Sequence, residues 1–290
     1  MTLLVLDPVP QSLSADVSRL IMQESHLHAE QVGFAEADTE TQNTSYKRLL
    51  MPGGEFCANA VRSLAAYMAF KECPGSPCYK ENPVYLIETS GVREPVECTV
   101  FRTDREGIFI SRARLPLPEA VISMEILHHK TITVYATLVI FPGITHLVAD
   151  PSVINNKEDF FLEARDQIGR CLNKNENCAE QDMLRQPRNS LSGPAQYKAL
   201  GIMYYNYTES YLEPLVWVRE TDTLVWERGC GSGTAAVGAA IAAKQKTSIS
   251  RKIKQPGGIM EVNASWKSRA VAELILSGEV QIVAEGTAYL

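Results

Sequence analysis

Short runs of apolar residues, many of them β-branched, recur along the chain and indicate β-strands. These runs lie at residues 3–6, 84–88, 96–101, 108–110, 131–141, 202–205, 215–219, 259–262 and 280–284. Apolar residues recur at helical spacing over residues 15–25, 58–71, 156–174 and 233–244. The pattern therefore predicts an α+β fold with more strands than helices.

Polar segments rich in glycine, proline and serine separate these elements and indicate loops. The longest of them are residues 39–46, 72–83 and 173–195. The sequence LPLP at residues 115–118 interrupts the predicted strands, because proline lacks the backbone donor that a strand needs. We therefore expect a domain boundary here, between a first domain at residues 1–114 and a second at residues 115–283.

Two segments that begin with a cysteine match one another along their length. CANAVRSLAAYMAFK (57–71) and CGSGTAAVGAAIAAK (230–244) both run from cysteine to lysine, and glycine precedes each of them. Leu64 and Met68 of the first segment fall on apolar residues of the second, four residues apart on one helix face. The match is explained either by two unrelated helices or by an internal duplication that gives each half one thiol at a helix N-terminus.

A thiol at a helix N-terminus suits proton transfer. The unpaired N–H groups of the first turn favour a thiolate and can also hold a carboxylate. If Cys57 and Cys230 face each other across a cleft, a thiolate removes the α-proton of a small acid and the opposite thiol delivers one. The pattern thus predicts a stereoinversion that needs no cofactor, with the two cysteines as the catalytic pair.

These motifs carry a resemblance to a known family. FCANA (56–60) and CGSGTA (230–235) resemble the two cysteine motifs of the diaminopimelate epimerase superfamily, which contains cofactor-independent amino-acid racemases and epimerases. The chain is most similar to the histidine racemases of staphylopine-type opine metallophore biosynthesis, through AEQVGF (29–34), GGEFCANA (53–60), SGV (90–92), CGSGTAA (230–236) and QPGG (255–258). The resemblance covers residues 2–289, nearly the whole chain.

The resemblance implies a fold and a set of site residues. It implies two pseudo-symmetric domains, each a β-barrel-like sheet around a central helix, with a C-terminal strand at residues 284–290 returning to the first domain. It makes Cys57 and Cys230 catalytic and puts His146 near the cleft. The residues expected to hold the substrate carboxylate are Ala58, Asn59, Gly231, Ser232 and Gly233.

Two glutamates are candidates for the pocket of the substrate side chain. Glu30 lies on a predicted strand with Val32 and Phe34 on the same face, and Glu227 lies three residues before Cys230. A buried carboxylate is costly unless it is paired, and a cationic or hydrogen-bonding substrate side chain would supply the partner. We expect both to line that pocket, Glu30 more strongly.

The chain departs from the family pattern at three places. Ala58 stands where the family usually has glycine, so the pocket is tighter there by one methyl group. Arg228 and Gly229 stand where the racemases carry small polar residues. The family's chain begins earlier, with a Gly-Asn loop that helps to close the site, whereas here Met1 and Thr2 fall directly on the first strand.

Composition limits the partners. The net charge is −6 without a basic patch, so we expect no nucleic-acid partner, and no apolar stretch is long enough for a membrane span. Seven cysteines without framework spacing indicate reduced thiols in a cytoplasmic protein, and pairs such as Cys73 and Cys78 lack zinc-site spacing. We expect no metal and no cofactor, a small amino acid as the bound partner, and a homodimer as one possible assembly.

The leading interpretation is conversion of L-histidine to D-histidine, and alternatives stay open. Within the fold they are diaminopimelate epimerase or a racemase of another amino acid. From other classes they are a two-domain binding protein for a small acid, or a cysteine hydrolase. The hydrolase would use Cys57 or Cys230 as nucleophile with His26, His28 or His146 as base.

Overall fold

A computed structural model describes residues 1–37, 46–72, 82–174, 184–185 and 197–290. Its helices are α1 (Gln11–Met22), α2 (Ala58–Glu72), a 3₁₀ turn η1 (Pro151–Val153), α3 (Lys157–Lys174) and α4 (Gly231–Gln245). Its strands are β1 (Thr2–Val5), β2 (Gln31–Ala37), β3 (Tyr46–Leu50), β4 (Val84–Thr89), β5 (Val96–Arg102), β6 (Ile108–Leu115), β7 (Ala120–His128), β8 (Ile132–Phe141), β9 (Ile144–Ala149), β10 (Leu184–Arg185), β11 (Ala199–Asn206), β12 (Tyr211–Val218), β13 (Thr223–Trp226), β14 (Ile249–Gln255), β15 (Gly258–Lys267) and β16 (Ala270–Gln281).

The predicted helices are all present, and the mixture with more strands than helices is confirmed. The helix expected at residues 15–25 begins and ends earlier, as α1, and the helix expected at residues 233–244 begins two residues earlier, as α4. The pattern missed β3, β7, β9, β10, β13 and β14. Of these, β7 and β9 alternate or run apolar over nine and six residues, whereas β10 and β13 have only two and four residues.

The strands of the described residues form one continuous mixed sheet. Their order is β1-β2-β3-β4-β5-β6-β16-β15-β14-β12-β11-β9-β8-β7-β10, with β13 paired to the edge of β12. The two halves of the chain meet where β16 pairs antiparallel with β6, from Leu274 opposite Leu115 to Gln281 opposite Ile108. The second half of the chain is therefore bonded to the first by a strand ladder.

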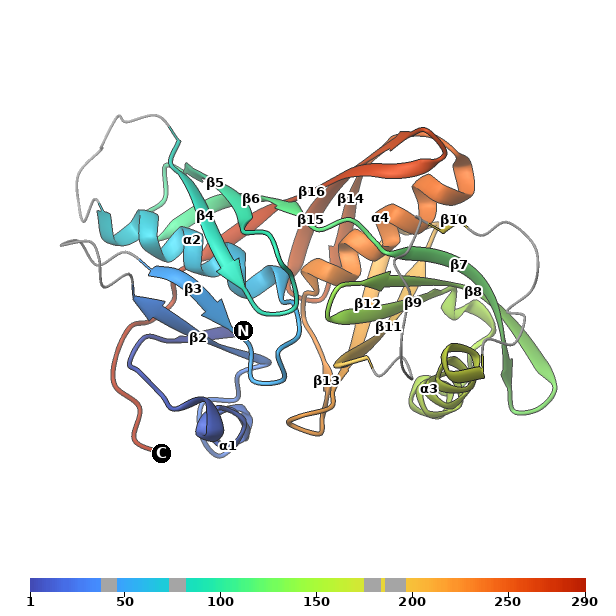
Figure 1. Ribbon diagram of the computed structural model, residues 1–290, viewed down its shortest axis with the longest axis horizontal. Helices are drawn as coiled ribbons and strands as arrows, with labels where there is room; N and C mark the ends of the chain where they lie inside the picture. Colours follow the sequence, from blue (N-terminus) through green and yellow to red (C-terminus); the bar gives the residue numbers. More distant parts are fainter. Residues whose placement is uncertain (38–45, 73–81, 175–183, 186–196) are drawn as a thin grey trace.

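Helices α2 and α4 lie inside this sheet, roughly end to end, with their N-termini toward one another (Figure 1). Both are buried on nearly all sides, as the alanine-rich sequences require, because a helix that is apolar all round needs cover on every face. One core cluster contains the buried residues of both helices. Helix α3 packs on a second cluster with β7, β8, β9 and β11, and α1 packs on a third with β1 and β2.

The prediction of a strand at residues 284–290 is wrong. Strand β16 ends at Gln281 and the following residues carry no strand. The strand that joins the first half is β16 itself, and β6 is already paired on both sides, with β5 and β16. The final segment still touches the first half, because Glu285 accepts a hydrogen bond from Tyr67 and pairs with Lys71 at 3.0 Å.

Most of the loops expected at residues 39–46, 72–83 and 173–195, and the pair Cys73 and Cys78, lie outside the described residues. Cys57, Cys98 and Cys230 carry free thiols, as expected. Cys171 is disulfide-bonded, so the expectation of reduced thiols throughout is wrong at that residue.

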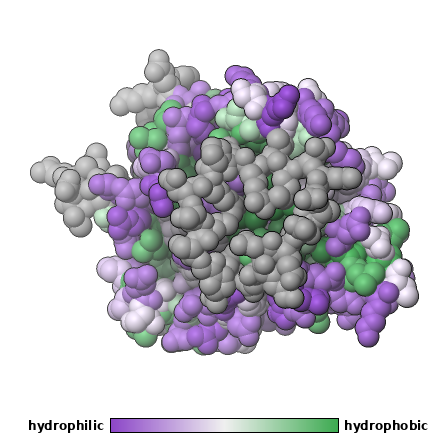
Figure 2. Space-filling model, turned by 45° about the vertical axis from the view of Figure 1, so that its right-hand side comes forward, coloured by the Kyte–Doolittle hydropathy of each residue, from purple (hydrophilic) through white to green (hydrophobic). Residues whose placement is uncertain are grey.

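The surface in Figure 2 is mostly hydrophilic among the described residues, with hydrophobic ones in small groups. Among the helices that the structure describes, none has both the length and the apolar character needed to cross a lipid bilayer.

Candidate active site

The two thiols occupy equivalent positions at the start of the two central helices. Cys230 caps α4, and its sulfur accepts a hydrogen bond from the N–H of Gly233 at 3.3 Å. Cys57 directly precedes α2, and its sulfur accepts from the N–H of Ala60 at 3.5 Å. In both cases the sulfur binds the amide three residues ahead, the position that serine or aspartate takes at an N-cap. The sequence match between the two segments thus extends to their local geometry.

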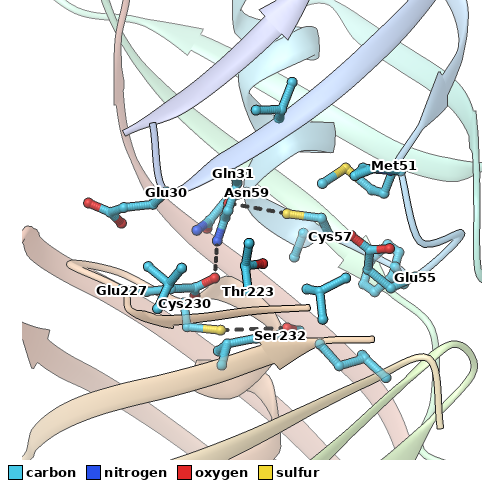
Figure 3. A pocket seen from close by; sticks show the side chains of 18 of the residues that line it. Glu30, Gln31, Met51, Glu55, Cys57, Asn59, Thr223, Glu227, Cys230 and Ser232 are labelled. Carbon is cyan, nitrogen blue, oxygen red and sulfur yellow. Dashed lines mark hydrogen bonds between the residues drawn. The ribbon is translucent and has the colours of Figure 1, made fainter. Parts of the chain in front are cut away.

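One cavity lies between these two helix starts and contains both thiols in its lining. Figure 3 shows Cys57 coming from the first half of the chain and Cys230 from the second. The cavity has a volume of about 40 Å³, which is room for about three water molecules.

Small residues allow the two helix starts to approach closely. A Cβ atom added to Gly231 would lie 2.9 Å from the Cβ of Ala58 and 2.8 Å from Oδ1 of Asn59. The Nδ2 group of Asn59 donates to the carbonyl oxygen of Gly229 at 2.6 Å, which joins the two cysteine segments directly. Residue 231 therefore has to be glycine, because no room exists there for a side chain.

A glutamine links one thiol to a buried carboxylate. The Cys57 thiol donates to Oε1 of Gln31 at 3.2 Å, and Nε2 of Gln31 donates to Oε1 of Glu227 at 2.5 Å. Glu227 also lies close enough to Cys230 for its charge to act on that thiol. Glu227 is thus connected to both sulfurs, directly to one and through an amide to the other.

Two carboxyl groups of the cavity wall are buried and each has an oxygen without a partner among the described residues: Oε2 of Glu55 and Oε2 of Glu227. Burial raises the pKa of Glu227 to about 7, although contacts with Cys230 and Gln31 oppose the rise. Burial likewise raises the pKa of Glu55 to about 7. Near neutral pH both groups can exist with or without a proton, which is the range a proton-transfer group needs.

Both thiols are protonated in this structure. Burial, followed by the charge of Glu227, raises the pKa of Cys57 to about 12, and the same causes raise the pKa of Cys230 well above its ordinary value. The amides of Ala60 and Gly233 act in the opposite direction, as expected for helix N-termini, but burial outweighs them. A thiolate therefore requires a change in the surroundings of the sulfur, such as the entry of a charged substrate group.

The cavity brings together most of the residues singled out from the sequence. Its lining contains both cysteines together with Glu30, Ala58, Asn59, Glu227, Gly231 and Ser232. Asn59 was expected to hold a substrate carboxylate through its amide, and in this structure that amide donates to the backbone carbonyl of Gly229.

His146 and Gly233 are not in the cavity wall. His146 is fully buried on β9, and its Nε2 lies 2.9 Å from Oγ of Ser232, which in turn lies 3.7 Å from the sulfur of Cys230. Burial lowers the pKa of His146 to about 3, so its imidazole is neutral. His146 therefore reaches the site only through Ser232.

The two glutamates both line the cavity, as expected, but they differ in their partners. Glu30 precedes β2 and does not follow the alternation of that strand. Its carboxylate pairs with the amino group of Met1 at 2.8 Å and accepts from the N–H of Arg228 at 2.9 Å. Glu227 keeps a free oxygen in the cavity and is the stronger candidate for a substrate contact.

Sequence reasoning missed Gln31 and Glu55 as site residues, and also Thr221 and Thr223 in the wall. Gln31 stands beside Glu30 in AEQVGF, and Glu55 stands two residues before Cys57 in GGEFCANA. The signal was available, because both are polar residues inside motifs already identified. His26 and His28, considered as bases for a hydrolase, are exposed after α1 and do not line the cavity.

Comparison with known proteins identifies the family to which the chain is similar. The family model described as the histidine racemase CntK N-terminal domain matches residues 1–179 and 170–289. A histidine racemase of Fusobacterium nucleatum subsp. nucleatum is 30% identical over 94% of this chain and 87% of its own. A histidine racemase of Staphylococcus aureus is 24% identical over 100% of this chain and 94% of its own.

Solved structures of racemases and epimerases share the fold. A probable proline racemase from Agrobacterium radiobacter matches with a TM-score of 0.53 at 12% identity, over 98% of this chain and 90% of its own. A predicted epimerase from Pseudomonas aeruginosa matches with a TM-score of 0.55 at 8% identity, over 98% of this chain and 93% of its own. The described chain therefore has a mixed α/β fold of the racemase and epimerase type.

Proposed function

The chain belongs to the histidine racemase family, and from this membership we propose that it interconverts L- and D-histidine through Cys57 and Cys230 on opposite faces of Cα. It is an isomerase, a cofactor-independent amino-acid racemase that acts on a small molecule. The observation that carries the mechanism is the pair of thiols, each capping a helix N-terminus, in the wall of one cavity.

The reaction needs only the groups in this wall. One sulfur, as thiolate, removes the α-proton, and the opposite thiol donates a proton to the other face of Cα. The substrate carboxylate takes up the charge that develops, and the first-turn amides of α2 and α4 stabilise it. Because the roles of the sulfurs exchange between directions, the same pair converts both enantiomers.

Glu227 is the group to which we assign control of the thiol protons. Its pKa of about 7 lets it lose a proton at neutral pH, whereas both thiols hold theirs. Its charge acts on both thiols, and hydrogen bonds through Gln31 link it to Cys57 as well. Entry of a substrate ammonium group would favour the charged forms of these groups and allow one thiol to ionise.

The side-chain pocket offers two hydrogen-bond acceptors without partners. Histidine carries two N–H-bearing groups, the α-ammonium and the imidazole, and the free oxygens of Glu55 and Glu227 could accept one each. A substrate with an apolar side chain would leave one buried carboxyl group unpaired, which is unfavourable. This arrangement supports histidine over substrates such as proline, the name-giving substrate of one structural neighbour.

We also propose that the halves at residues 1–114 and 115–283 are two pseudo-symmetric domains of the diaminopimelate epimerase type. The equal sulfur-to-amide capping at Cys57 and Cys230 supports a duplication. So does the match of one family model to residues 1–179 and to residues 170–289. Three further points stay predictions from the sequence. They are the supply of D-histidine to an opine metallophore pathway, assembly as a homodimer, and a cytoplasmic location.

The test is a chiral assay of purified protein with single L-amino acids: histidine, proline, alanine and phenylalanine, together with diaminopimelate. We expect D-histidine to form, and kcat/KM for histidine to exceed that for alanine and phenylalanine by at least about tenfold, since an unpaired buried group costs one to three kcal/mol. Conversion of diaminopimelate in preference to histidine would move the function to the epimerase. Inversion of none of these amino acids would contradict the proposal.

The role of Glu55 has its own matched control. Glu55→Gln and Glu30→Gln make the same change in the same cavity wall, but only Glu55 has an oxygen without a partner. If Glu55 binds the imidazole, Glu55→Gln lowers the preference for histidine over alanine and Glu30→Gln leaves it close to that of the wild type. Equal preferences in all three proteins would remove Glu55 from the side-chain pocket.

A further inference from the structure

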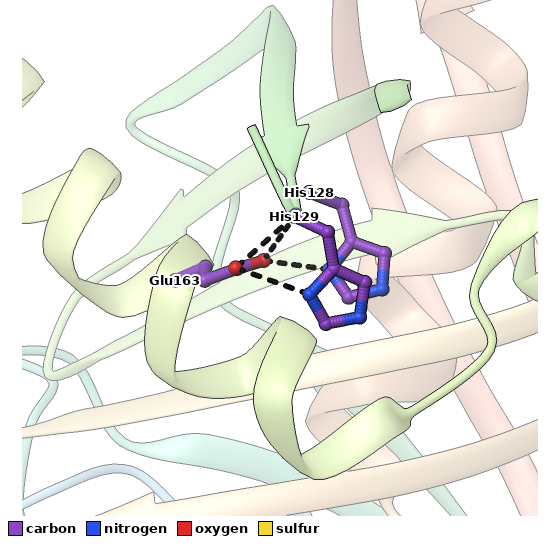
Figure 4. A group of neighbouring side chains, drawn as sticks. All are labelled: His128, His129 and Glu163. Atoms are coloured by element: carbon purple, nitrogen blue, oxygen red, sulfur yellow. Dashed lines mark hydrogen bonds and ion pairs between the residues drawn. The ribbon is translucent and has the colours of Figure 1, made fainter. Parts of the chain in front are cut away.

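A second cluster of chemically active side chains lies away from the cavity, between the β7–β8 hairpin and α3. It contains His128, His129 and Glu163, whose nearest nitrogen and oxygen atoms all lie within 4.8 Å of one another (Figure 4). Nδ1 of His128 lies 2.6 Å from Oε2 of Glu163, and Nδ1 of His129 lies 3.7 Å from Oε1. None of the three residues lines the active-site cavity.

The turn of the hairpin explains why two consecutive histidines point the same way. Neighbouring side chains of a strand point to opposite faces, but β7 ends at His128, and His129 and Lys130 have φ values of 49° and 61°. Two central residues with positive φ form a tight hairpin turn. The ring of His129 is thereby folded back over that of His128, with 3.8 Å between the ring centroids.

Other hydrogen bonds hold the third group in place. The backbone N–H of His129 donates to both oxygens of Glu163, at 3.1 and 3.3 Å. One turn further along α3, the side chain of Gln167 bonds both the N–H and the carbonyl oxygen of Leu127, each at 2.9 Å. The carboxylate and the two imidazoles are therefore fixed relative to each other by two elements of the fold.

We propose that His128, His129 and Glu163 bind one divalent transition-metal cation, with Zn²⁺ as the best fit. Two imidazoles and one carboxylate form a ligand set that Zn²⁺ accepts, at distances of about 2.0 to 2.2 Å. Tetrahedral ligands at that distance are about 3.4 Å apart. The separations of 2.6 and 3.7 Å between the histidine nitrogens and the carboxylate oxygens bracket this value, and all three ligand atoms lie within 4.8 Å of one another. No separation therefore has to change by more than about 1.4 Å.

The chemistry of the neighbourhood agrees with a bound cation. His128 is fully buried and its Nδ1 already faces the carboxylate of Glu163, so a metal bound at Nδ1 would replace that hydrogen bond with two bonds to one ion and leave the ring proton on Nε2. His129 and Glu163 are partly exposed, at 43% and 33%, which gives the ion a path from solvent and leaves a fourth position for water. The metal would fasten α3 to the end of β7.

The expectation of no metal rested on cysteine spacing, which says nothing about this cluster. The adjacent histidines are visible in the sequence, but Glu163 comes from a helix 34 residues later. Only the fold brings the carboxylate to the hairpin.

The test uses Co²⁺ as a spectroscopic substitute in full-length protein with Cys57→Ser and Cys230→Ser, which removes the active-site thiols as competing ligands. Co²⁺ is titrated into metal-free protein and followed by visible absorption, with and without His129→Ala or Glu163→Gln. His26→Ala is the matched control, because His26 is an exposed histidine outside the cluster.

We expect one Co²⁺ per chain, a d–d spectrum without a thiolate charge-transfer band, and displacement by Zn²⁺. His129→Ala and Glu163→Gln should each weaken binding by more than about tenfold, and His26→Ala should not. In the background with both cysteines intact, His129→Ala should keep full racemase activity, which verifies that the variant folds. Absence of binding, a thiolate spectrum, or equal affinity in His129→Ala and its control would each overturn the proposal.

Discussion

The two thiol sites share one backbone geometry and differ in what surrounds the sulfur. Cys57 is 9% exposed and donates to the amide oxygen of Gln31, which cannot take a proton. Cys230 is 3% exposed, lies next to the carboxyl group of Glu227 and contacts Ser232. The helix cap is the same at both sulfurs, and the route by which a proton can leave differs.

This difference indicates a division of labour within an outwardly symmetric pair. A racemase must serve two mirror-image substrates, so both sulfurs need the same position relative to a helix N-terminus. A single carboxyl group can still regulate both protons if it touches one sulfur and reaches the other through a bridge. Glu227 and Gln31 provide this arrangement.

The largest expected effect comes from removing either sulfur. Cys57→Ala and Cys230→Ala should each lower kcat/KM for racemisation by about 10³-fold or more in both directions, since each variant lacks the acid or the base of every turnover. Chiral chromatography of reactions started from L- and from D-histidine measures this loss. If one single variant keeps more than about a tenth of the activity, the two sulfurs are not both required.

The next effect tests whether Glu227 governs the protons. Glu227→Gln should lower kcat/KM by about 10²-fold, because the amide keeps the shape and the bridge to Gln31 but cannot exchange a proton. The matched change Glu30→Gln should cost less than about tenfold, because that carboxylate is already held by Met1 and Arg228. Equal losses in the two variants would remove the distinction between the glutamates.

The same carboxyl group predicts how stability depends on pH. The pKa of Glu227 rises from 4.5 to about 7 on folding, which corresponds to a penalty of at most roughly 3 kcal/mol for the ionised form. Below pH 4.5 the proton is bound in folded and unfolded chains and there is no penalty. Between pH 4.5 and 7 the unfolded chain loses its proton first, so the wild type loses stability as the pH rises.

Urea unfolding of wild type and Glu227→Gln at pH 4.5 and pH 8 measures this linkage. The variant should gain stability relative to the wild type between the two values, by up to about 3 kcal/mol. His146, whose lowered pKa has the opposite pH dependence, is present in both proteins and cancels. A constant difference between the two proteins would mean that Glu227 ionises in the folded chain as it does in the unfolded one.

The smallest expected effect concerns Gln31, which joins Cys57 to Glu227 by hydrogen bonds. Gln31→Leu should lower kcat/KM by about tenfold and move the acidic limb of its pH profile upward, since Glu227 loses a hydrogen bond that favours its ionised form. A merely structural role for Gln31 would lower activity without moving the pH profile. The pH dependence of kcat/KM for L-histidine between pH 5 and 9 separates the two.

Local signals in the sequence predicted much of this molecule. The cysteine segments, the central helices and the pairing of two thiols followed from composition and spacing over a few residues. What failed depends on long-range contacts. The strand expected at residues 284–290 has no free edge to join, because β6 is occupied by β5 and β16. Glu30 lines the cavity as expected, but the sequence could not predict that the fold brings the Met1 amino group to its carboxylate.

The site residues that the sequence did not predict were missed for a similar reason. Gln31 becomes part of the site because Glu227 lies 196 residues away in sequence and next to it in space. The influence of burial on the thiols was also beyond the sequence. A helix N-terminus alone favours a thiolate, and only the folded structure shows that burial reverses this preference.

The most direct test of the two-thiol mechanism follows the isotope in each enantiomer. L-Histidine and D-histidine are incubated separately with the protein in D₂O, and deuterium at Cα is measured by mass spectrometry after chiral separation, at less than a tenth of full conversion. Two sulfurs on opposite faces predict deuterium in the product and almost none in the recovered substrate, whichever enantiomer is supplied. Equal labelling of product and recovered substrate at that early stage would mean that one group serves both faces, and would contradict the account.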